Sequence, residues 1–456
     1  MQFAFFALIP DPETRQVLAV HENGRWVLPQ FTADTPSFKW PVPMNVAVAD
    51  WLGVPVTVRR YLRNPIPMSN DETWVVVFEL HALLPSLPPG SHWIDREDLV
   101  AANRDYPPLY QLIRAWLVEH DAHESVPAVR PSWDSIGWWS TANAWITEQL
   151  DAHGIRHTGP VTQFKWGATA VILQAPTTAG AIFFKATAPL LGREAQITRQ
   201  LADHFASFLP DLIASDEQRN WLLMHQLPGV PLFKCAELTE WEAAMRAIAA
   251  IQIGATQYGS QLLEWGCADR RVARLAGQYQ QLLGDLAAPE WQQVYTVTAE
   301  EVTHLQHCLP TVETLCTQLE RYGIPDSIGH GDLHAGNIMV AVETVTIFDW
   351  TAGALTHPFF DLLTLIGEGG GPAGASDGAT IAHLVQIYLV PWCDQHGKEA
   401  VEAAFTLSQQ LAPLYMALIY CQITRGIEPD AWWEWSPEVG AYLRMFLDRI
   451  DKAPLS

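Results

Sequence analysis

The sequence predicts an α+β fold, in which a β-rich part comes first and a larger helical part follows. Strand-like runs alternate with turns over about the first 120 residues and return between residues 161 and 227, and helical patterns dominate from there to the end. Apolar residues make up 49% of the 456-residue chain and charged residues 17%. This apolar content is sufficient for the hydrophobic cores of two or three compact units, and it argues against disorder.

The first 120 residues are predicted to form one unit. A helical pattern at 107–120 places Leu109, Leu112, Ile113 and Trp116 on one stripe. The clearest strands are Phe3–Ile9, Gln16–His21 and Trp74–Leu80. Asn45–Leu52 is expected to be a short apolar helix that Gly53 closes. A polar passage marked by prolines, residues 121–131, is the predicted linker.

From Trp133 onward the pattern changes to mixed strands and helices, and after residue 228 it becomes mostly helical. Thr239 to Glu242 reads as a capping box for the helix that follows. The Gly-rich segment 367–378 is predicted to be a mobile loop. The expected strands are Val161–Phe164, Ala170–Gln174, Ala181–Ala186 and Trp221–Leu227, and the expected helices are Trp139–His153, Arg193–Phe205, Ala299–Tyr322, Thr380–Leu389, Lys398–Ile419 and Val439–Ile450.

Charge and cysteine content exclude several classes of protein. The net charge of −23 provides no basic field for a duplex or an anionic membrane, so we expect no nucleic-acid and no membrane partner. The six cysteines show no CxxC pair or zinc-finger spacing and are typical of reduced, mostly buried thiols. No apolar run approaches the roughly 20 residues of a membrane span, and the first residues lack the basic start of a signal peptide. We therefore expect a cytoplasmic protein.

The stretch that points to chemistry runs from His330 to Asn337 (HGDLHAGN) and is followed by FDW at residues 348–350. Phosphoryl transfer needs oxygen ligands for Mg²⁺ and a carboxylate that orients the attacking hydroxyl. Asp332 and Asn337 are five residues apart, which is the Asp-to-Asn spacing of a kinase catalytic loop.

A predicted hairpin adds a third oxygen-bearing side chain. Residues 338–341 and 345–348 are apolar and strand-like, on either side of a turn centred on Glu343. In that register Asn337 lies beside Asp349 at the open end of the hairpin, so the two side chains would form a magnesium site next to Asp332.

Two other interpretations compete. His330, Asp332 and His334 have the alternation of a His-x-Asp-x-His zinc or iron site. Alternatively, the stretch is a polar turn without chemistry. Neither explains why the hairpin brings Asn337 and Asp349 together, so we favour the kinase interpretation.

HGDLHAGN with the downstream FDW resembles the Brenner-type motif of the aminoglycoside phosphotransferase and choline kinase superfamily, and the resemblance extends roughly from Trp133 to Ile450. It implies a protein-kinase-like two-lobed fold that binds ATP with Mg²⁺, with a small lobe at 132–228 and a large helical lobe at 229–456. It also implies roles for individual residues: Asp332 as catalytic base, Asn337 and Asp349 as metal ligands, His330 as a brace of the loop, and Asp361 as a buried acid that supports it. Only 12 positions separate Asp349 from Asp361, which leaves no room for an activation segment and favours a small hydroxylated acceptor.

The resemblance further implies nucleotide-binding residues in the small lobe. Lys185, a charge in an apolar strand, would bind the phosphates, and Glu194 would hold it. The alternatives are an edge-strand charge for Lys185 and a favourable helix N-terminal charge for Glu194. The turn at Trp166 and Gly167 would cover the phosphates. It has one glycine, whereas the GxGxxG loop of protein kinases has three. Backbone groups of His225 and Leu227 would contact adenine, although the same strand can be an ordinary buried one.

The acceptor site is left open by the sequence. A C-terminal segment combines acids with tryptophans that suit a cation or a sugar, but it can equally be a surface segment whose tryptophans pack the last helix. Its residues are Glu428, Asp430, Trp432, Trp433, Glu434 and Trp435. The acidity of the chain hints at a cationic acceptor. The oligomeric state stays open, with a dimer as one option.

Residues 1–120 partly resemble a Nudix domain, through WVLP at 26–29 and a helical stretch that ends at Gly53. Anchoring the Nudix box on Gly53 leaves only Asp50 where a carboxylate could bind metal. The other box positions carry Thr32, Phe38, Val46, Ala47 and Trp51. Because pyrophosphate hydrolysis needs several clustered carboxylates, we expect a degenerate domain that does not hydrolyse. A scaffold is its default role, and the alternatives are binding of the acceptor, contact with the kinase lobes and dimerisation.

The whole sequence therefore predicts an ATP- and Mg²⁺-dependent kinase that phosphorylates a hydroxyl group of a small molecule. The alternative is a nucleotide-binding regulatory protein with a kinase fold and weak catalysis.

Overall fold

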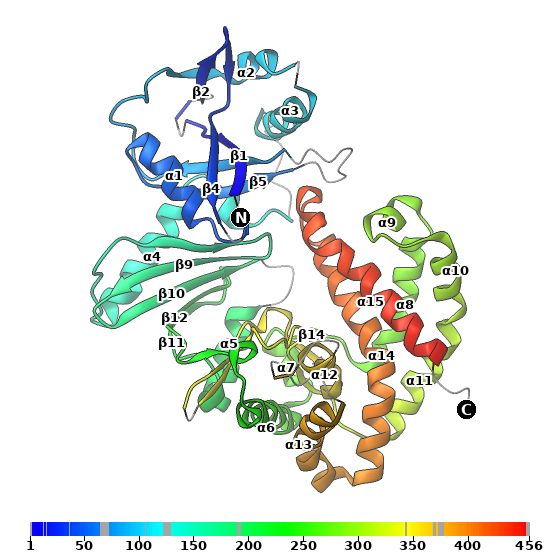
Figure 1. Ribbon diagram of the computed structural model, residues 1–456. Coiled ribbons are helices and arrows are strands. Elements are labelled where there is room, and N and C mark those ends of the chain that lie inside the picture. The colour runs from blue at the N-terminus through cyan, green and yellow to red at the C-terminus, as the bar shows by residue number, and fades with distance from the viewer. Residues whose placement is uncertain are drawn as a thin grey trace. The chain divides into compact units, whose positions relative to one another are not determined.

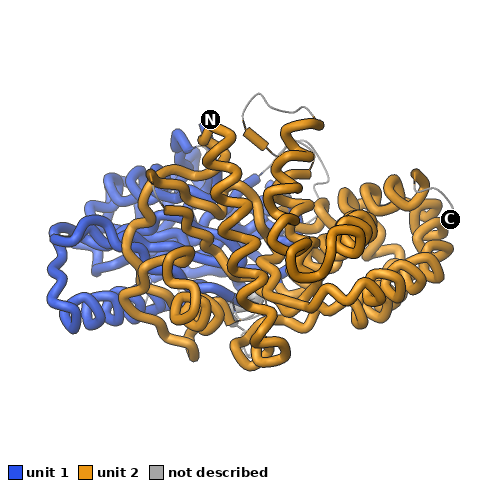
Figure 2. The backbone as a smooth tube through the Cα atoms, turned by 90° about the horizontal axis from the view of Figure 1, so that it is seen from below, with its two compact units in different colours: residues 1–188, 427–433 blue, residues 189–426, 434–456 orange. Residues whose placement is uncertain are grey.

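The computed structural model describes residues 2–11, 13–14, 16–35, 37–63, 73–104, 106–121, 129–188, 193–342, 344–367, 371–372 and 378–452. They contain both helices and sheets, which confirms the predicted α+β class (Figure 1). The chain forms two compact units (Figure 2). Unit 1 contains residues 1–188 and 427–433, and unit 2 contains residues 189–426 and 434–456.

Unit 1 begins with two sheets. In the first, the order is β4-β1-β6-β5, with β1 antiparallel to β4 and parallel to β6. The second has the order β3-β2-β7. Their strands are β1 (Gln2–Leu8), β2 (Gln16–Glu22), β3 (Arg25–Val27), β4 (Gln30–Asp34), β5 (Val56–Leu62), β6 (Val75–Leu80) and β7 (Ser91–Asp95). The predicted strands at 3–9, 16–21 and 74–80 are confirmed to within one residue at each end.

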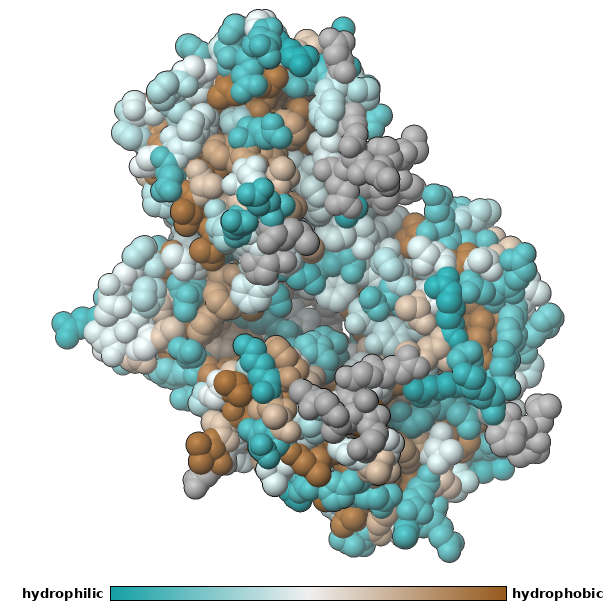
Figure 3. All heavy atoms as spheres, in the orientation of Figure 1, coloured by the Kyte–Doolittle hydropathy of each residue, from teal (hydrophilic) through white to brown (hydrophobic). Residues whose placement is uncertain are grey.

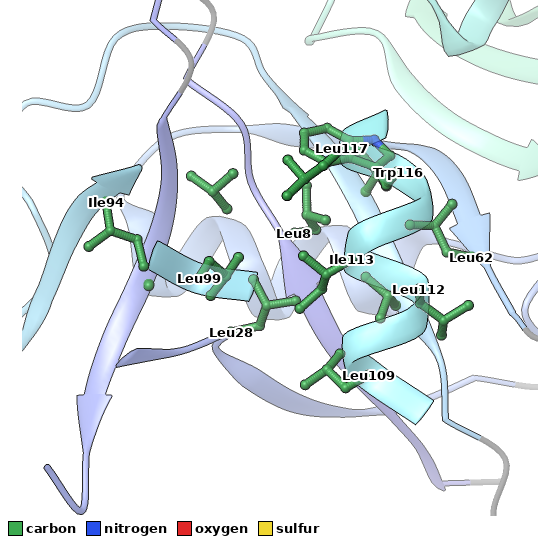
Figure 4. Packing of buried hydrophobic residues seen from close by; sticks show 14 residues of the cluster. Leu8, Leu28, Leu62, Ile94, Leu99, Leu109, Leu112, Ile113, Trp116 and Leu117 are labelled. Atoms are coloured by element: carbon green, nitrogen blue, oxygen red, sulfur yellow. The ribbon is translucent and has the colours of Figure 1, made fainter. Parts of the chain in front are cut away.

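Three helices accompany these sheets: α1 (Val42–Leu52), α2 (Arg96–Ala102) and α3 (Pro107–Asp121). The stripe predicted for α3 is buried in the core of this part, where Figure 4 shows Leu109, Leu112, Ile113 and Trp116 along one side of the helix. Gly53 ends α1 in the left-handed conformation with φ 72°, as the predicted closure of that helix requires.

The rest of unit 1 consists of a short turn η1 (Ser132–Asp134), α4 (Trp138–Ala152), and the strands β8 (Thr162–Trp166), β9 (Ala170–Thr177) and β10 (Gly180–Thr187). These three strands pair antiparallel in sequence order. The alternating burial of β9 is that of a strand with one face on the core. The predicted strands and helix of this part are confirmed, each a few residues longer or shorter.

Unit 1 also contains a segment from near the C-terminus, residues 427–433, which includes the turn η8 (Pro429–Ala431). Arg60 contacts Asp430 at 2.6 Å, and Arg130 contacts Glu428 at 2.7 Å and Asp134 at 3.3 Å. These side chains are at most 18% exposed. Glu428 and Asp430, which we considered for a cationic acceptor, are therefore neutralised by buried arginines.

Unit 2 is mostly helical. Its elements up to residue 321 are α5 (Glu194–Phe205), β11 (Leu212–Asp216), β12 (Trp221–His225), β13 (Val230–Pro231), α6 (Leu238–Ala255), α7 (Gln261–Glu264), β14 (Ala268–Asp269), α8 (Val272–Leu286), α9 (Pro289–Val294), α10 (Ala299–His307) and α11 (Leu309–Arg321). The later ones are β15 (Ser327–Gly329), β16 (Ile338–Val340), β17 (Val345–Ile347), η6 (Trp350–Ala352), β18 (Ala354–Thr356), η7 (Pro358–Asp361), α12 (Leu362–Ile366), α13 (Gly378–His396), α14 (Lys398–Arg425) and α15 (Trp432–Lys452). The first two residues of α15 belong to unit 1.

Two small sheets of unit 2 carry the HGDLHAGN segment. One has the order β13-β16-β17, and the other has the order β14-β18-β15. The segment runs from the end of β15 to the start of β16. Gly229, which precedes β13, has φ 87°, and a Cβ atom there would lie 2.0 Å from the Val340 carbonyl oxygen. Only glycine lets the chain pass β16 this closely.

Three predictions about elements of unit 2 need correction. The helix expected at 299–322 is two helices, because Cys308 closes α10 and Pro310 opens α11 as its second residue. The capping box of α6 is formed by Glu237 and Glu240 rather than by Thr239 and Glu242. The strand expected at 221–227 ends at His225. The predicted loop at 367–378 and the predicted linker at 121–131 lie largely outside the described residues.

The surface mixes hydrophilic and apolar residues on the face shown in Figure 3. Five of the six cysteine side chains are buried, and all six are free thiols, as predicted. Within the described ranges, no helix combines the length and the apolar character that crossing a membrane requires.

Candidate active site

The loop after β15 is held in place by a buried carboxylate. Asp361, which is 2% exposed, accepts hydrogen bonds from the backbone N–H groups of His330 at 2.8 Å and Gly331 at 3.0 Å. Gln252 on α6 donates a third at 2.9 Å. Burial raises the pKa of Asp361 to about 6, and the hydrogen bonds act in the opposite direction. The predicted support of the loop by this acid is confirmed.

His330 braces the same loop from within. Its Nε2 lies 2.9 Å from the Phe348 carbonyl oxygen, and its Nδ1 accepts the Asp332 N–H at 3.3 Å. A neutral ring with the proton on Nε2 satisfies both bonds. Since both ring nitrogens are occupied, His330 is not placed to bind a metal, and the predicted brace is confirmed.

The loop presents Asp332 towards solvent. Its side chain is 39% exposed, whereas its backbone carbonyl accepts hydrogen bonds from His334 N at 2.9 Å and from Asn337 Nδ2 at 3.0 Å. Gly331 makes this turn possible, because it has φ 75° and a Cβ atom there would lie 2.7 Å from the Ala352 carbonyl oxygen. The backbone of Asp332 is thus fixed while its carboxylate stays accessible.

The predicted hairpin exists, but its register is shifted by one residue. Ile338 pairs with Ile347 and Val340 with Val345, so Asn337 lies opposite Phe348 rather than Asp349. The reason is a tight turn closed between Ala341 and Thr344, which moves the centre of the hairpin off Glu343, a residue outside the described ones.

Asp349 lies after the end of β17, where the backbone leaves the extended conformation. Its backbone is left-handed, with φ 67° and ψ 54°, a conformation that asparagine and aspartate adopt more readily than most residues. Its Oδ1 lies 2.6 Å from the hydroxyl oxygen of Thr351. The same hydroxyl lies 2.9 Å from Oε2 of Glu194, which is 2% exposed at the start of α5. Thr351 thus links the two acids, and nothing in its sequence context predicted this.

Comparison with known families agrees with this arrangement. Residues 166–391 match the model of the phosphotransferase enzyme family. The match spans 226 of the 456 residues, just under half of the chain. No curated protein sequence matches the chain.

Solved structures similar to the chain have low sequence identity. A choline/ethanolamine kinase family protein from Mesorhizobium loti is 16% identical with a TM-score of 0.48, over 69% of this chain and 95% of that one. A choline kinase from Streptococcus pneumoniae is 11% identical with a TM-score of 0.48, over 68% and 99%. A spectinomycin phosphotransferase in complex with ADP and spectinomycin is 13% identical with a TM-score of 0.41, over 67% and 98%.

The remaining predicted residues of unit 1 lie at its end, between Trp166 and Lys185. Lys185 is buried on β10, opposite Ile172. Gly167 lies in the turn between β8 and β9. Trp166 is buried, and its indole donates to the Arg59 carbonyl at 3.0 Å and packs on the Tyr61 ring. Its side chain therefore serves the packing of unit 1.

His225 is the last residue of β12, and Leu227 lies two residues beyond it. The His225 N–H is bonded to the Asp211 carbonyl at 3.1 Å, so the His225 carbonyl is the group of this residue's backbone left for a ligand. Among the described residues, the Leu227 N–H has no hydrogen-bond acceptor. One backbone acceptor and one backbone donor are thus present two residues apart.

Two tyrosines near Asp332 were not predicted from the sequence. Tyr420 on α14 and Tyr442 on α15 stack with ring centroids 5.5 Å apart. Burial raises the pKa of both, to about 12 for Tyr442, and the charges of Asp332 and Glu438 add to this. Trp435 lies beside Tyr420, with the two ring centroids 6.0 Å apart. Only the packing of α14 and α15 within unit 2 brings these rings near Asp332.

The zinc interpretation finds no support among the residues that the structure describes. There, no three His, Cys, Asp or Glu side chains group so that they could hold a metal ion. His334, the third member of the suggested cluster, uses its Nδ1 to accept the Gly336 N–H at 2.9 Å. The oxygen ligands predicted for magnesium are of another kind, one amide and one carboxylate.

Proposed function

We propose that this protein is an ATP- and Mg²⁺-dependent kinase that transfers the γ-phosphoryl group to a hydroxyl group of a small molecule. The observation that carries this proposal is the fixed backbone of Asp332, held by Asp361 and His330, with an accessible carboxylate. A rigid loop that presents one carboxylate suits a reaction in which the protein mainly positions the reactants.

In the proposed reaction, the Asp332 carboxylate accepts the proton of the acceptor hydroxyl. The acceptor oxygen forms a bond to the γ-phosphorus while the bond between that phosphorus and the β,γ-bridging oxygen breaks. The products are ADP and a phosphate ester, and the proton leaves Asp332 for solvent. No covalent enzyme intermediate is required.

The donor set fits a magnesium ion. Because Asn337 donates its Nδ2 to the Asp332 carbonyl, its amide is oriented and its Oδ1 remains as an oxygen ligand. Asp349, kept in place by Thr351, would supply the carboxylate ligand. When bound, Mg²⁺ would neutralise the phosphate oxygens of the nucleotide. Lys185 and Glu194 are proposed as the phosphate-binding pair, and Trp166, Gly167, His225 and Leu227 as nucleotide contacts through their backbones.

The acceptor is proposed to be cationic. Tyr420, Tyr442 and Trp435 supply aromatic faces, and Asp332 and Glu438 supply negative charge near them. A cation is attracted to both aromatic faces and carboxylates. Amino alcohols are therefore the first compounds to offer as acceptors.

Acceptor-stimulated ADP release from ATP tests the proposal. Asp332→Asn and Asp349→Asn are expected to lower the rate at least about 100-fold, because the first removes the proposed base and the second the proposed carboxylate ligand of Mg²⁺. Asp394→Asn, at an exposed aspartate of α13, is the matched control and should retain full activity. Equal rates in Asp332→Asn and the wild type would contradict the assignment.

The alternative, a regulatory protein with a kinase fold, makes a different prediction. It would bind ATP with the same Asp349 dependence but release no ADP with any acceptor. The Nudix-like assignment of residues 1–120 remains a proposal, as do the domain limits at 120, 131 and 228. A nucleoside diphosphate that stays intact when incubated with Asp332→Asn would agree with a domain that does not hydrolyse.

A further inference from the structure

Unit 1 contains a cavity that the proposed kinase reaction does not use. It has a volume of about 580 Å³, which lies in the range of sites for small organic ligands. Its lining comes from α1, α4, the adjoining ends of β5 and β6, and residues 157–163, all within unit 1. The residues proposed for phosphoryl transfer are not among its lining.

One wall of the cavity is an apolar helix face. Val42, Val46 and Ala49 of α1 are spaced four and three residues apart, so they share one side of the helix. Val42 is 42% exposed and Val46 is 52% exposed, although both are apolar. Exposed apolar side chains at the edge of a cavity are typical of a site that binds an apolar surface.

A second wall is polar but carries no charge. Ser140, Asn143 and Thr147 of α4 share one side of that helix and line the cavity. Within the described residues, the side chains of Ser140 and Asn143 form no hydrogen bond to other protein groups. Amide and hydroxyl groups in this state can donate to and accept from the hydroxyl groups of a ligand.

A flat ring pair forms part of the same lining. The rings of His81 and Trp139 stack with centroids 4.3 Å apart and 14° between their planes. Burial lowers the pKa of His81 to about 4, so this ring is neutral at pH 7. His81 Nε2 lies 3.3 Å from the Thr57 hydroxyl.

The electrostatics of the cavity exclude an anionic ligand. No Lys or Arg occurs in the lining, all of which is described, and its one carboxylate, Glu79, accepts the Gly137 N–H at 2.8 Å. A phosphate group enclosed here would meet no cation and would lie near a carboxylate. An uncharged molecule suits the cavity better.

We propose that this cavity is a second ligand site, which takes an uncharged nucleoside, with the base against the apolar face of α1 and the ribose hydroxyls against the polar face of α4. A flat apolar part joined to a hydroxyl-bearing part matches the two walls. The volume exceeds what a single sugar ring would fill. The site is separate from the proposed nucleotide site and does not depend on catalysis.

The experiment is a calorimetric titration of the full-length protein with adenosine in the presence of saturating Mg·ADP, which occupies the proposed nucleotide site. Wild type is expected to bind one adenosine per chain. Val46→Trp, which fills the mouth of the cavity, should weaken binding at least about tenfold. Val390→Trp is the matched control, because Val390 on α13 is also 52% exposed, and its affinity should stay within about twofold of wild type.

Asn143→Ala provides a second variant that adds no bulk and should weaken adenosine binding about threefold or more. It decides the question if Val46→Trp does not fold. Absence of adenosine binding by wild type, or unchanged affinity in Val46→Trp or Asn143→Ala, would overturn the proposal. Failure of the kinase proposal would show separately, as absence of ADP release, and would leave the adenosine titration interpretable.

Discussion

At the scale of single residues, the site depends on side chains that act on other side chains. Asp361 and Gln252 do not face the reactants but fix the loop that carries Asp332. Thr351 similarly connects Asp349 with Glu194. Asp361 and Gln252 come from other parts of the chain than the loop, whereas Thr351 lies two residues after Asp349. Each of these groups replaces solvent as a hydrogen-bond partner.

Thr351→Val tests the positioning of Asp349. Valine has the shape of threonine without the hydroxyl, so the variant loses the link between the two acids. A hydrogen bond to a charged group contributes about 1.5–3 kcal/mol, so we expect kcat to fall about tenfold to a hundredfold. Thr314→Val on α11, where the hydroxyl bonds only a helix carbonyl, should leave kcat unchanged. If both variants keep wild-type kcat, Thr351 does not position Asp349.

His357 makes stability sensitive to pH. It is fully buried, and burial lowers the pKa of its imidazole to about 3, whereas the unfolded chain has the ordinary value near 6.5. Below pH 6.5 the unfolded state therefore takes up a proton that the folded state does not, and stability falls as pH falls from 6.5 towards 3. The loss approaches about 1.4 kcal/mol per pH unit for this one group.

His357→Asn should remove this dependence. Asparagine keeps an acceptor for the Phe359 N–H, which His357 Nδ1 accepts at 3.4 Å. Between pH 7 and pH 5, urea unfolding should show wild type losing about 2 kcal/mol more than the variant. His307→Asn, at an exposed histidine on α10, should follow wild type. Parallel pH curves for wild type and His357→Asn would contradict the argument.

At the scale of elements, the strands and helices with strong periodicity were predictable, and their connections were not. The stripe of α3 and the strand-like runs of β1 and β6 identified these elements correctly. The hairpin β16–β17 was also predicted, yet its register was wrong by one because the turn is tighter than the sequence indicated. Turn geometry depends on one or two backbone dihedral angles that composition does not fix.

The residues of the candidate site also divide into those that the sequence could predict and those that it could not. Asp332, Asn337 and Asp349 could be proposed because they lie in one short segment with a recognisable spacing. Tyr420 and Tyr442 were missed because they lie about 90 residues or more downstream and reach Asp332 only through the packing of α14 and α15. Contacts of that sequence separation leave no local pattern in a single sequence.

Gly229→Ala tests the close passage of the chain along β16. Alanine is strained at φ 87°, and its Cβ would lie 2.0 Å from the Val340 carbonyl oxygen, so the backbone must move. We expect a loss of at least about 2 kcal/mol of stability and a lower affinity for ATP. Gly284→Ala in α8 has open space and ordinary helical backbone, and it should stabilise the protein by about 0.5–1 kcal/mol. Thermal unfolding of both variants, with opposite shifts expected, is the measurement.

At the scale of the whole molecule, the division into units does not follow the order of the chain. The segment 427–433 belongs to unit 1, where Glu428 and Asp430 pair with Arg130 and Arg60. Buried ion pairs such as these contribute modestly when complete but are costly to break, because the partner charge stays buried.

Arg60→Ala should therefore destabilise the protein by about 3–5 kcal/mol, since it leaves Asp430 and Asp134 without a cation they now contact. Arg246→Ala removes an exposed ion pair with Glu242 on α6 and should cost less than about 0.5 kcal/mol. Urea unfolding of the full chain compares the two. Equal losses would show that the buried pairs contribute no more than a surface pair.

This interleaving limits how the polypeptide can be divided. A single cut after Ala188 would separate Arg60 and Arg130 from two of their three acidic partners, and it would leave Glu428 and Asp430 on the other fragment without arginines. Each fragment would expose charged side chains without their partners on a surface that is buried in the intact protein. The two pieces are therefore expected to reassociate or precipitate rather than to persist as independent proteins.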